Sequence, residues 1–282
     1  MSVAVPAIGR PRGAPRAGKR WRARVAYYLP AAVVFVLGLV VWEVGVGVLG
    51  DAAFVLPRPS AILAALGENW GAGRWPLAKA AMATLSEAIG GLVIGTVAGT
   101  IAAFATARWA TAREVLLPVG IGASAVPIIA FAPLMNNWFG VLNPLSKMMI
   151  VAVLVFFPVY VNVVRGLVQV DASALELMRS YAASEWTILR RVRIPNALPY
   201  FFTALKVSAT LSLIGAIVGE YFGGANDVLG RAIVQSASAL RFDVTWAAII
   251  LGAASGIAAY IAIVSVERLV IPWHASVRGE GP

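Results

Sequence analysis

The sequence predicts an all-α integral membrane protein with six transmembrane helices and a polar helical hairpin between the fourth and the fifth. Composition is the first reason for this prediction. The chain is 60% hydrophobic and only 13% charged, whereas an ordinary soluble domain is about 25% charged. The second reason is that the apolar residues gather into runs of the roughly 20 residues that an α-helix needs to cross a bilayer.

Six such runs follow one another along the chain. The first follows a basic segment, as in a signal peptide. It is longer than the ~7–15 apolar residues of a signal sequence, however, and no clear A-x-A cleavage site follows it. We therefore interpret it as a retained first transmembrane helix. The six predicted spans are residues 25–50, 80–107, 115–138, 145–168, 199–223 and 244–271.

The segments at the two ends and between the first two spans are more polar. Residues 1–24 are rich in Pro, Gly and Arg and have too little apolar surface to fold alone, so we expect a disordered basic tail. Residues 25–271 then form the transmembrane domain, and residues 272–282 form a C-terminal tail. The stretch LPRPSAILAAL predicts a short interfacial helix with Ser60 as its N-cap.

The basic residues predict the topology. The net charge is +10, from 23 Lys and Arg against 13 Asp and Glu. Such an excess can indicate nucleic-acid binding, but here the basic residues lie in loops between apolar runs, which favours a role in membrane topology. Most of these loop charges fall on the side of the N-terminus. The positive-inside rule therefore places both termini and the hairpin in the cytoplasm.

The hairpin, residues 171–199, lies between two of the most hydrophobic regions of the chain. Ser173 and Glu176 have the spacing of a capping box that opens a helix. Ser184 can cap a second helix, and Pro195 is expected to end it, because proline lacks the N–H that a helix interior needs. Arginines that would not easily lie in lipid are Arg179, Arg190, Arg191 and Arg193. These features predict a docking element on the membrane surface.

Polar residues inside the spans are the candidates for a translocation path. Glu43, Glu87 and Glu220 lie in or near predicted spans, where an ionisable group is costly and a functional role is the first hypothesis. Interfacial contacts, or ion pairs with Lys79 or Lys206, explain them equally well. Asn136 and Asn137 lie at the end of the third span, where their amide groups either bind a polar solute or hold a loop in place. The candidate path residues are Ser124, Pro127, Asn136, Asn137, Ser212 and Glu220.

Small residues recur at every fourth position of the second span, at Gly91, Gly95 and Gly99. This spacing is typical of close packing between membrane helices. We therefore expect the three glycines to contact another helix rather than a ligand.

The sequence lacks motifs for covalent chemistry or nucleotide binding. It has no Cys and a single His, His274, which follows the last span. No paired carboxylates or H-E-x-x-H motif occur, and none of its four lysines lies in a G-x-x-x-x-G-K-[ST] phosphate-binding loop. We expect a transport subunit rather than an enzyme, with no cofactor or metal of its own. Any ATP and Mg²⁺ would bind to a partner subunit.

The hairpin carries Glu176, Ala182, Val192 and the pair Ile194-Pro195 at a spacing that resembles the EAA loop of binding-protein-dependent ABC importer permeases. The resemblance extends to LPRPSAIL, PLMNNWFG and ALPYFFTALKVSATLSLIGAIVGEYFG, so it covers most of the chain after the tail. Together these motifs look like the permease group that serves nitrate, sulfonate, taurine, pyrimidine-precursor and riboflavin importers.

The resemblance implies a mechanism and a set of partners. The segment would be an EAA-type coupling hairpin, seated in a groove of a cytoplasmic ABC ATPase. The permease would lie in the cell inner membrane, pair with a second copy of itself, and receive a small solute from a periplasmic or lipid-anchored solute-binding protein. The coupling residues that the resemblance implies are Glu176, Leu177, Met178, Ala182, Ser184, Val192, Ile194 and Pro195.

The hairpin departs from the family pattern at three positions. Leu177 and Met178 replace two alanines, which predicts a larger apolar knob that fits a matching ATPase. Ala182 replaces a glycine at the turn. An alanine in a left-handed conformation costs about 1–2 kcal/mol, so we expect the bend to use a right-handed geometry or to pivot at Ser184.

An ATP-independent secondary transporter or channel is the alternative interpretation. It predicts transport by the chain alone, driven by an ion gradient. No internal repeat is evident, and this weakens the case for an inverted-repeat transporter. The solute stays open between a nitrate-, sulfonate- or taurine-like anion and a riboflavin- or pyrimidine-precursor-like compound. Aromatic residues in the third and fourth spans favour the ring compounds slightly.

Overall fold

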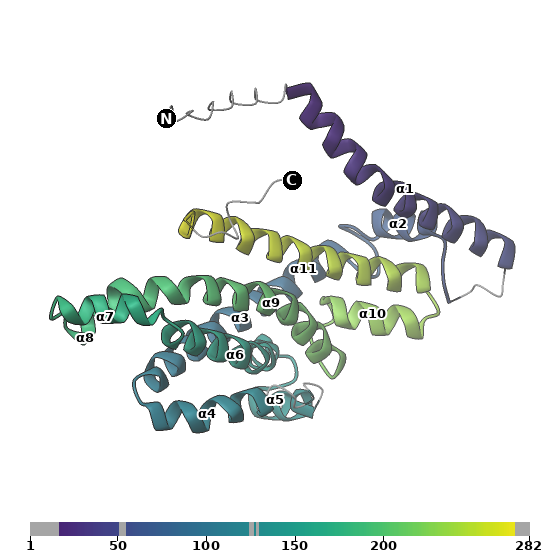
Figure 1. Cartoon of the computed structure of the whole chain (residues 1–282). Helices are drawn as coiled ribbons and strands as arrows, with labels where there is room; N and C mark the ends of the chain where they lie inside the picture. Colours follow the sequence, from purple (N-terminus) through teal and green to yellow (C-terminus); the bar gives the residue numbers. More distant parts are fainter. Residues whose placement is uncertain (1–16, 51–54, 124–126, 128–129, 274–282) are drawn as a thin grey trace, which may run out of the picture. The chain divides into compact units, whose positions relative to one another are not determined.

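The computed structural model describes residues 17–50, 55–123, 127 and 130–273, and over these residues helices are the only regular secondary structure (Figure 1). By its internal contacts the chain divides into two units, residues 1–60 and residues 61–282. The helices are α1 (Ala17–Leu49), α2 (Pro59–Glu68), α3 (Leu77–Ala107), α4 (Ala110–Ala123), α5 (Phe131–Phe139), α6 (Pro144–Val168), α7 (Ala172–Ser180), α8 (Glu185–Ile188), α9 (Ile194–Tyr221), α10 (Leu229–Ser238) and α11 (Phe242–Val270).

The first unit consists mainly of α1. Within this unit the carboxylate of Glu43 accepts hydrogen bonds from the backbone N–H of Ser60 (3.0 Å) and from its hydroxyl group (2.6 Å). The prediction that Ser60 caps the short helix was wrong, because α2 begins at Pro59 and Ser60 lies in its first turn. Glu43 instead satisfies one of the backbone N–H groups that a helix leaves free at its start.

Five helical segments in the described residues are long and apolar enough to cross a membrane: Ala26–Val48, Leu77–Ala107, Pro144–Val168, Glu185–Tyr221 and Phe242–Val270. They correspond to the first, second, fourth, fifth and sixth predicted spans. The third, residues 115–138, falls on α4 and α5, whose lengths of 14 and 9 residues are each too short for a bilayer. The chain between these two helices is only partly described, so the count of six stays a prediction.

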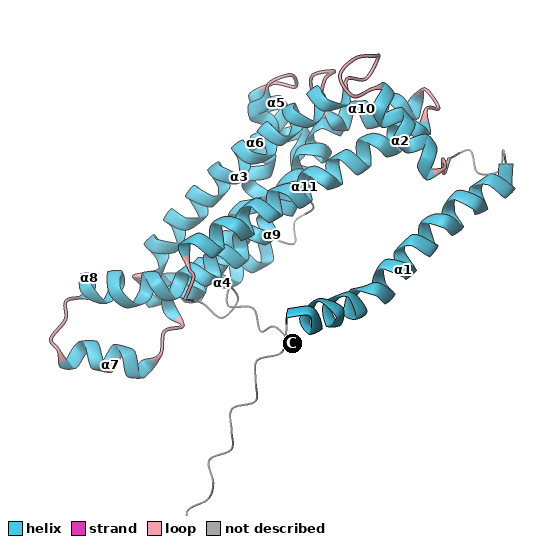
Figure 2. Cartoon of the chain, turned by 90° about the horizontal axis from the view of Figure 1, so that it is seen from above, coloured by secondary structure: helices cyan, strands magenta, loops and turns pink. Residues whose placement is uncertain are grey.

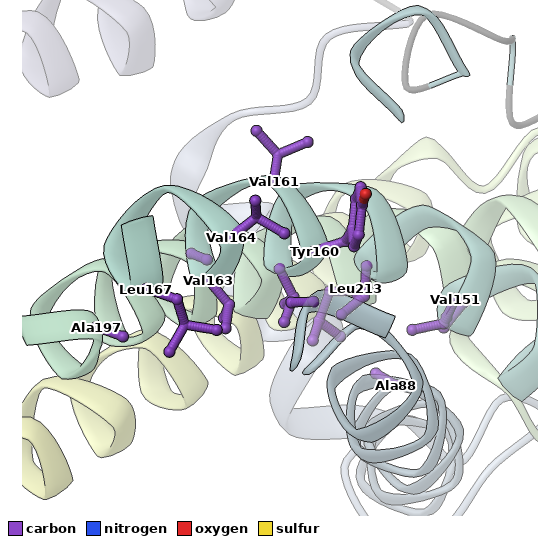
Figure 3. Close-up of a cluster of buried hydrophobic side chains, with 14 residues drawn as sticks. Ala88, Val151, Tyr160, Val161, Val163, Val164, Leu167, Ala197 and Leu213 are labelled. Atoms are coloured by element: carbon purple, nitrogen blue, oxygen red, sulfur yellow. The ribbon is translucent and has the colours of Figure 1, made fainter. Parts of the chain in front are cut away.

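Helix α6 is the centre of the second unit. In its most apolar stretch 56% of the residues are buried, against 28% in α3 and 22% in α11. Its valines form one buried cluster with Ala88 of α3 and with Ala197 and Leu213 of α9 (Figure 3). A helix that is apolar on all sides is suited to such a position, because both of its flanks face other helices.

The glycine ridge of α3 brings this helix against the backbone of α6. A β-carbon built on Gly95 would lie 2.5 Å from the carbonyl oxygen of Ala152, and one built on Gly99 would lie 2.8 Å from that of Phe156. Only a residue without a side chain permits so close an approach. The prediction that these glycines contact another helix is confirmed, and the contact is typical of helix association in lipid.

Lys79 and Lys206, considered as possible partners of Glu43, Glu87 and Glu220, pair with other acidic residues. Lys206 of α9 forms a bidentate ion pair with Glu267 of α11, at 2.9 and 3.0 Å. Lys79 pairs with Asp227 at 2.8 Å in an exposed position, and its hydrogen bond holds the pKa of Asp227 below the ordinary value. Lys206 therefore joins two spanning helices, whereas Lys79 lies at the surface of the second unit.

The hairpin forms as two short helices, but its boundaries differ from those predicted. Asp171 is the N-cap of α7 and accepts from the Ser173 N–H (3.0 Å), so the predicted Ser173–Glu176 capping box was wrong. Ser184 caps α8, as predicted. Pro195 does not end the second helix. A π-helical turn, Leu189–Arg193, joins α8 directly to α9, and Pro195 lies in the first turn of α9, just after the π-helical turn.

The bend between α7 and α8 is a Schellman motif. The N–H of Ala183 donates to the carbonyl of Met178 (3.1 Å), and the N–H of Ala182 donates to that of Arg179 (2.9 Å). This motif needs a left-handed residue, and Ala182 has a φ of +50°. The expected right-handed bend was therefore wrong. The turn that glycine makes in the family pattern is retained here by an alanine at a steric cost.

Replacing Ala182 with glycine should stabilise this bend. Glycine removes the left-handed penalty but adds backbone entropy to the unfolded state, so the net gain should be about 1 kcal/mol. We expect hydrogen exchange of the amides at positions 182 and 183 to slow about fivefold. Ala183→Gly, at the next position, is the control and should not slow exchange. Equal or faster exchange in the Ala182 variant would contradict the strain at this residue.

Candidate functional site

The hairpin lies at one end of the second unit, and α5 and α10 lie at the opposite end (Figure 2). Its apolar side chains are open to solvent: Leu177 is 56% exposed, Tyr181 76% and Trp186 68%. Ordinarily such side chains would be covered, and an exposed cluster of them marks an interaction surface. We refer to Leu177, Tyr181 and Trp186 as the hairpin face.

The residues predicted for coupling fall into two groups. Glu176, Leu177, Ala182 and Ser184 are exposed, so a partner can reach them. The others are half-buried: Met178 lies within α7, and Val192, Ile194 and Pro195 lie where the hairpin meets the spanning helices. The hairpin therefore has an outer surface suited to docking and an inner surface that attaches it to the helix bundle.

Three buried ionisable groups from three different helices gather near the opposite end. Glu87 of α3, Lys147 of α6 and Glu220 of α9 are all buried and interact electrostatically with one another. Lys147 also donates to the carbonyl oxygen of Val141. One carboxylate oxygen of Glu87 and one of Glu220 are buried without a hydrogen-bond partner among the described residues. Ionisable groups buried in this way at membrane depth are costly, so the three residues are candidates for a functional role.

Glu220 also fixes the start of α10. Its Oε2 accepts from the backbone N–H of Gly230 (2.6 Å), and the hydroxyl oxygen of Thr84 accepts from the N–H of Leu229 (2.9 Å). These are the first free N–H groups of α10, whose own N-cap residue, Val228, offers no side-chain acceptor. Side chains of α9 and α3 thus cap a helix that lies far from Thr84 in the sequence.

The predicted path residues differ in burial and in hydrogen bonding. Asn136 is buried, and neither atom of its amide has a hydrogen-bond partner among the described residues. Asn137 is exposed, and the Ser212 hydroxyl donates within its own helix, to the carbonyl of Ala209 (2.8 Å). Pro127 is exposed, and Ser124 lies outside the described residues. Among these, Asn136 has the most unused hydrogen-bonding capacity.

An apolar hollow of about 360 Å³ lies between α9 and α11. Its lining includes Leu213, Ile217, Gly252 and Gly256, and Thr210 is its only polar residue. A cavity of this chemistry suits acyl chains or apolar side chains and not a polar solute. We therefore do not count it as part of a translocation path.

Comparison with known proteins identifies the family. Residues 95–272 match the family model described as the binding-protein-dependent transport system inner membrane component. The chain belongs to this family. The match covers the helices from the middle of α3 to the end of α11, and with them the hairpin. The permease is therefore a multi-pass membrane protein of ABC transport systems, as the resemblance of its hairpin implies.

Individual relatives resemble the permease over nearly its whole length. A riboflavin transport system permease protein of Chloroflexus aurantiacus is 30% identical over 86% of this chain and 90% of its own. A formylaminopyrimidine transport permease protein of Halalkalibacterium halodurans is 28% identical over 87% and 96%. A permease protein of Escherichia coli named for aliphatic sulfonate transport is 30% identical over 91% and 94%.

Sequence reasoning missed several residues of these sites. Lys147 was not singled out, although it lies inside α6 and is buried. Tyr181 and Trp186 were not singled out, yet two aromatic residues within a polar, Arg-rich stretch are themselves a signal of an interaction surface. Thr84 carried no signal, because its role depends on a backbone N–H of α10 that is distant in the chain.

Proposed function

We propose that this permease is the membrane subunit of an ABC importer and that ATP hydrolysis in a separate ATPase subunit drives solute through it. The hairpin face is the site at which the ATPase binds. ATP binding closes two ATPase subunits, which move the hairpins of two permease copies and change the side of the membrane to which the path opens. ATP and Mg²⁺ bind on the ATPase.

The observation that carries this proposal is the exposure of the hairpin face. Leu177, Tyr181 and Trp186 present apolar and aromatic side chains that the described residues of the second unit leave exposed. Aromatic residues and arginine are the most frequent hot spots of protein interfaces. Exposed arginines adjoin the face, including Arg179, Arg190 and Arg191. This combination supports a partner groove with an apolar floor and acidic residues at its rim.

The second part of the proposal concerns the solute, for which we favour a neutral ring compound such as a vitamin or pyrimidine precursor. The relatives named for riboflavin and formylaminopyrimidine support this class. The charges of the spans support it as well. Lys147 is buried and interacts electrostatically with Glu87 and Glu220, and Lys206 is paired with Glu267. Neither of these two lysines is exposed to attract a sulfonate.

Transport by the purified complex tests both parts. Proteoliposomes would contain the permease with its ATPase and its solute-binding protein, and uptake of tritiated riboflavin and tritiated taurine would be measured with and without ATP. We expect ATP-dependent uptake of riboflavin and little uptake of taurine. Uptake by the permease alone would contradict the coupling to an ATPase. Preferential uptake of taurine would leave that coupling intact and contradict the solute class.

A further inference from the structure

Asn196 joins the two ends of the hairpin. It lies near the start of α9, and its side-chain Nδ2 donates to the carbonyl oxygens of Gly166 (2.8 Å) and Gln169 (3.0 Å). Gly166 is in the last turn of α6, and Gln169 is the C-cap of that helix. One amide group of α9 therefore holds the end of α6 at the point where the hairpin leaves the bundle.

The last carbonyl groups of α6 depend on this contact with Asn196. The last carbonyl groups of a helix have no partner within the helix. Many helices satisfy them with a left-handed residue after the C-cap, as α7 does at Ala182. Val170, the residue after the C-cap Gln169, is not left-handed, so α6 ends without that motif. The amide of Asn196 takes its place and satisfies carbonyls that would otherwise bind water and fray.

Packing reinforces the same junction. A β-carbon built on Gly166 would lie 2.7 Å from the Cα atom of Ala197, so the two backbones touch beside the amide contact. The hydroxyl group of Tyr200 lies 3.4 Å from Oε1 of Gln169. The leg of the hairpin that contains α7 starts at this junction, and the leg that contains α8 returns to it through the π-helical turn.

We infer that Asn196 is a positioning residue that clamps both legs of the hairpin, so that a displacement of the hairpin reaches α6 and α9 together. This inference rests on the proposed function, in which the ATPase moves the hairpin. The α8 leg is continuous with α9 through helical hydrogen bonds. The α7 leg reaches α6 only through the short segment 169–171, and the amide of Asn196 stiffens that segment.

Hydrogen exchange of the purified permease tests whether the clamp holds the end of α6. Asn196→Ala should speed exchange of the amides of Gln169 and Val170 by about fivefold or more, the factor that corresponds to one net hydrogen bond. Asn162→Ala is the matched control. Asn162 is also half-buried, but its Nδ2 donates within α6, to the carbonyl of Pro158 (2.8 Å). Equal exchange rates at positions 169 and 170 in the two variants would overturn the clamp.

A second measurement tests whether the clamp transmits motion. The chain has no Cys, so single environment-sensitive fluorophores can be attached through Arg165→Cys at the exposed end of α6 and, separately, Thr203→Cys on α9. In the complex with the ATPase, both labels should respond to ATP when Asn196 is present. With Asn196→Ala, the response on α9 should persist and that on α6 should fall at least about fivefold. Asn162→Ala should leave both responses unchanged.

The outcomes separate the clamp from the proposed function. A full response of the α6 label in the Asn196→Ala complex would overturn transmission through the clamp. A parallel loss of both responses would indicate a general structural defect and would also overturn it. If neither label responds to ATP in the complex that retains Asn196, the proposed coupling to an ATPase fails, and the exchange measurement alone decides whether Asn196 holds the end of α6.

Discussion

Replacing Trp186 with aspartate is expected to abolish ATP-driven uptake while the permease still folds and reaches the membrane. Trp186 is 68% exposed, so its loss removes few contacts within the chain. It also lies in the first turn of α8, where a carboxylate is favourable next to the free N–H groups of the helix. The fold should therefore tolerate the change, and a groove that buries the indole ring should not.

The effect of Trp186→Asp should be measurable as a weaker affinity of the permease for the ATPase. An aromatic hot spot contributes about 2 kcal/mol or more, so affinity for the ATPase should fall at least about 30-fold. Titration calorimetry of the detergent-solubilised permease with its ATPase measures this directly. Trp273→Asp is the matched control, because Trp273 is also exposed, at 53%, but lies after α11. An unchanged affinity for the Trp186 variant, or an equal loss for the Trp273 variant, would refute the hairpin face as the binding site.

Replacing Gly95 with leucine should have the largest effect on folding. The β-carbon alone would approach the Ala152 carbonyl oxygen to 2.5 Å, and a backbone atom cannot move aside as a flexible side chain can. Helices α3 and α6 would have to separate along the tightest contact of the core. We expect a destabilisation of about 3 kcal/mol or more, visible as a lower melting temperature and as aggregation on size-exclusion chromatography.

The corresponding control is Gly45→Leu in α1, where a β-carbon meets nothing within 4 Å. This variant should behave as the unchanged permease does in both measurements. Equal stability of the Gly95 and Gly45 variants would show that the α3–α6 contact contributes little to folding. A loss confined to the Gly95 variant would establish that the small residues of α3 act through close packing.

Hydrophobic patterning predicted much of this fold. Apolar runs located five segments that can span a membrane, because length and composition suffice for that inference. The same reasoning identified the glycine ridge. Prediction from the sequence failed where the neighbouring structure overrides the usual conformational preference of a residue. Pro195 is expected to break a helix, but here it follows a π-helical turn within one continuous helical segment, Glu185–Tyr221.

The candidate sites were less predictable than the spans. The position of the hairpin followed from its charge and spacing, and Ser184 was recognisable as a cap. The left-handed conformation of Ala182 could not be predicted, because it is energetically unfavourable for an alanine. The Schellman motif imposes this conformation nevertheless. Pairs such as Lys206 with Glu267 lie 61 residues apart, and the partner of a buried charge cannot be read without the packing of the helices.

The way α10 begins has a consequence for the order in which the chain assembles. Its first two N–H groups depend on Glu220 and on Thr84, the latter 145 residues earlier. Glu220 is only 10 residues from Gly230, but Thr84 is not in place until α3 has met the part of the chain that contains α10, and a contact so distant in sequence forms late because of the chain entropy that its closure costs. Insertion of the spans therefore comes first. Helix α10 folds onto them afterwards, as a late step that reports on correct assembly.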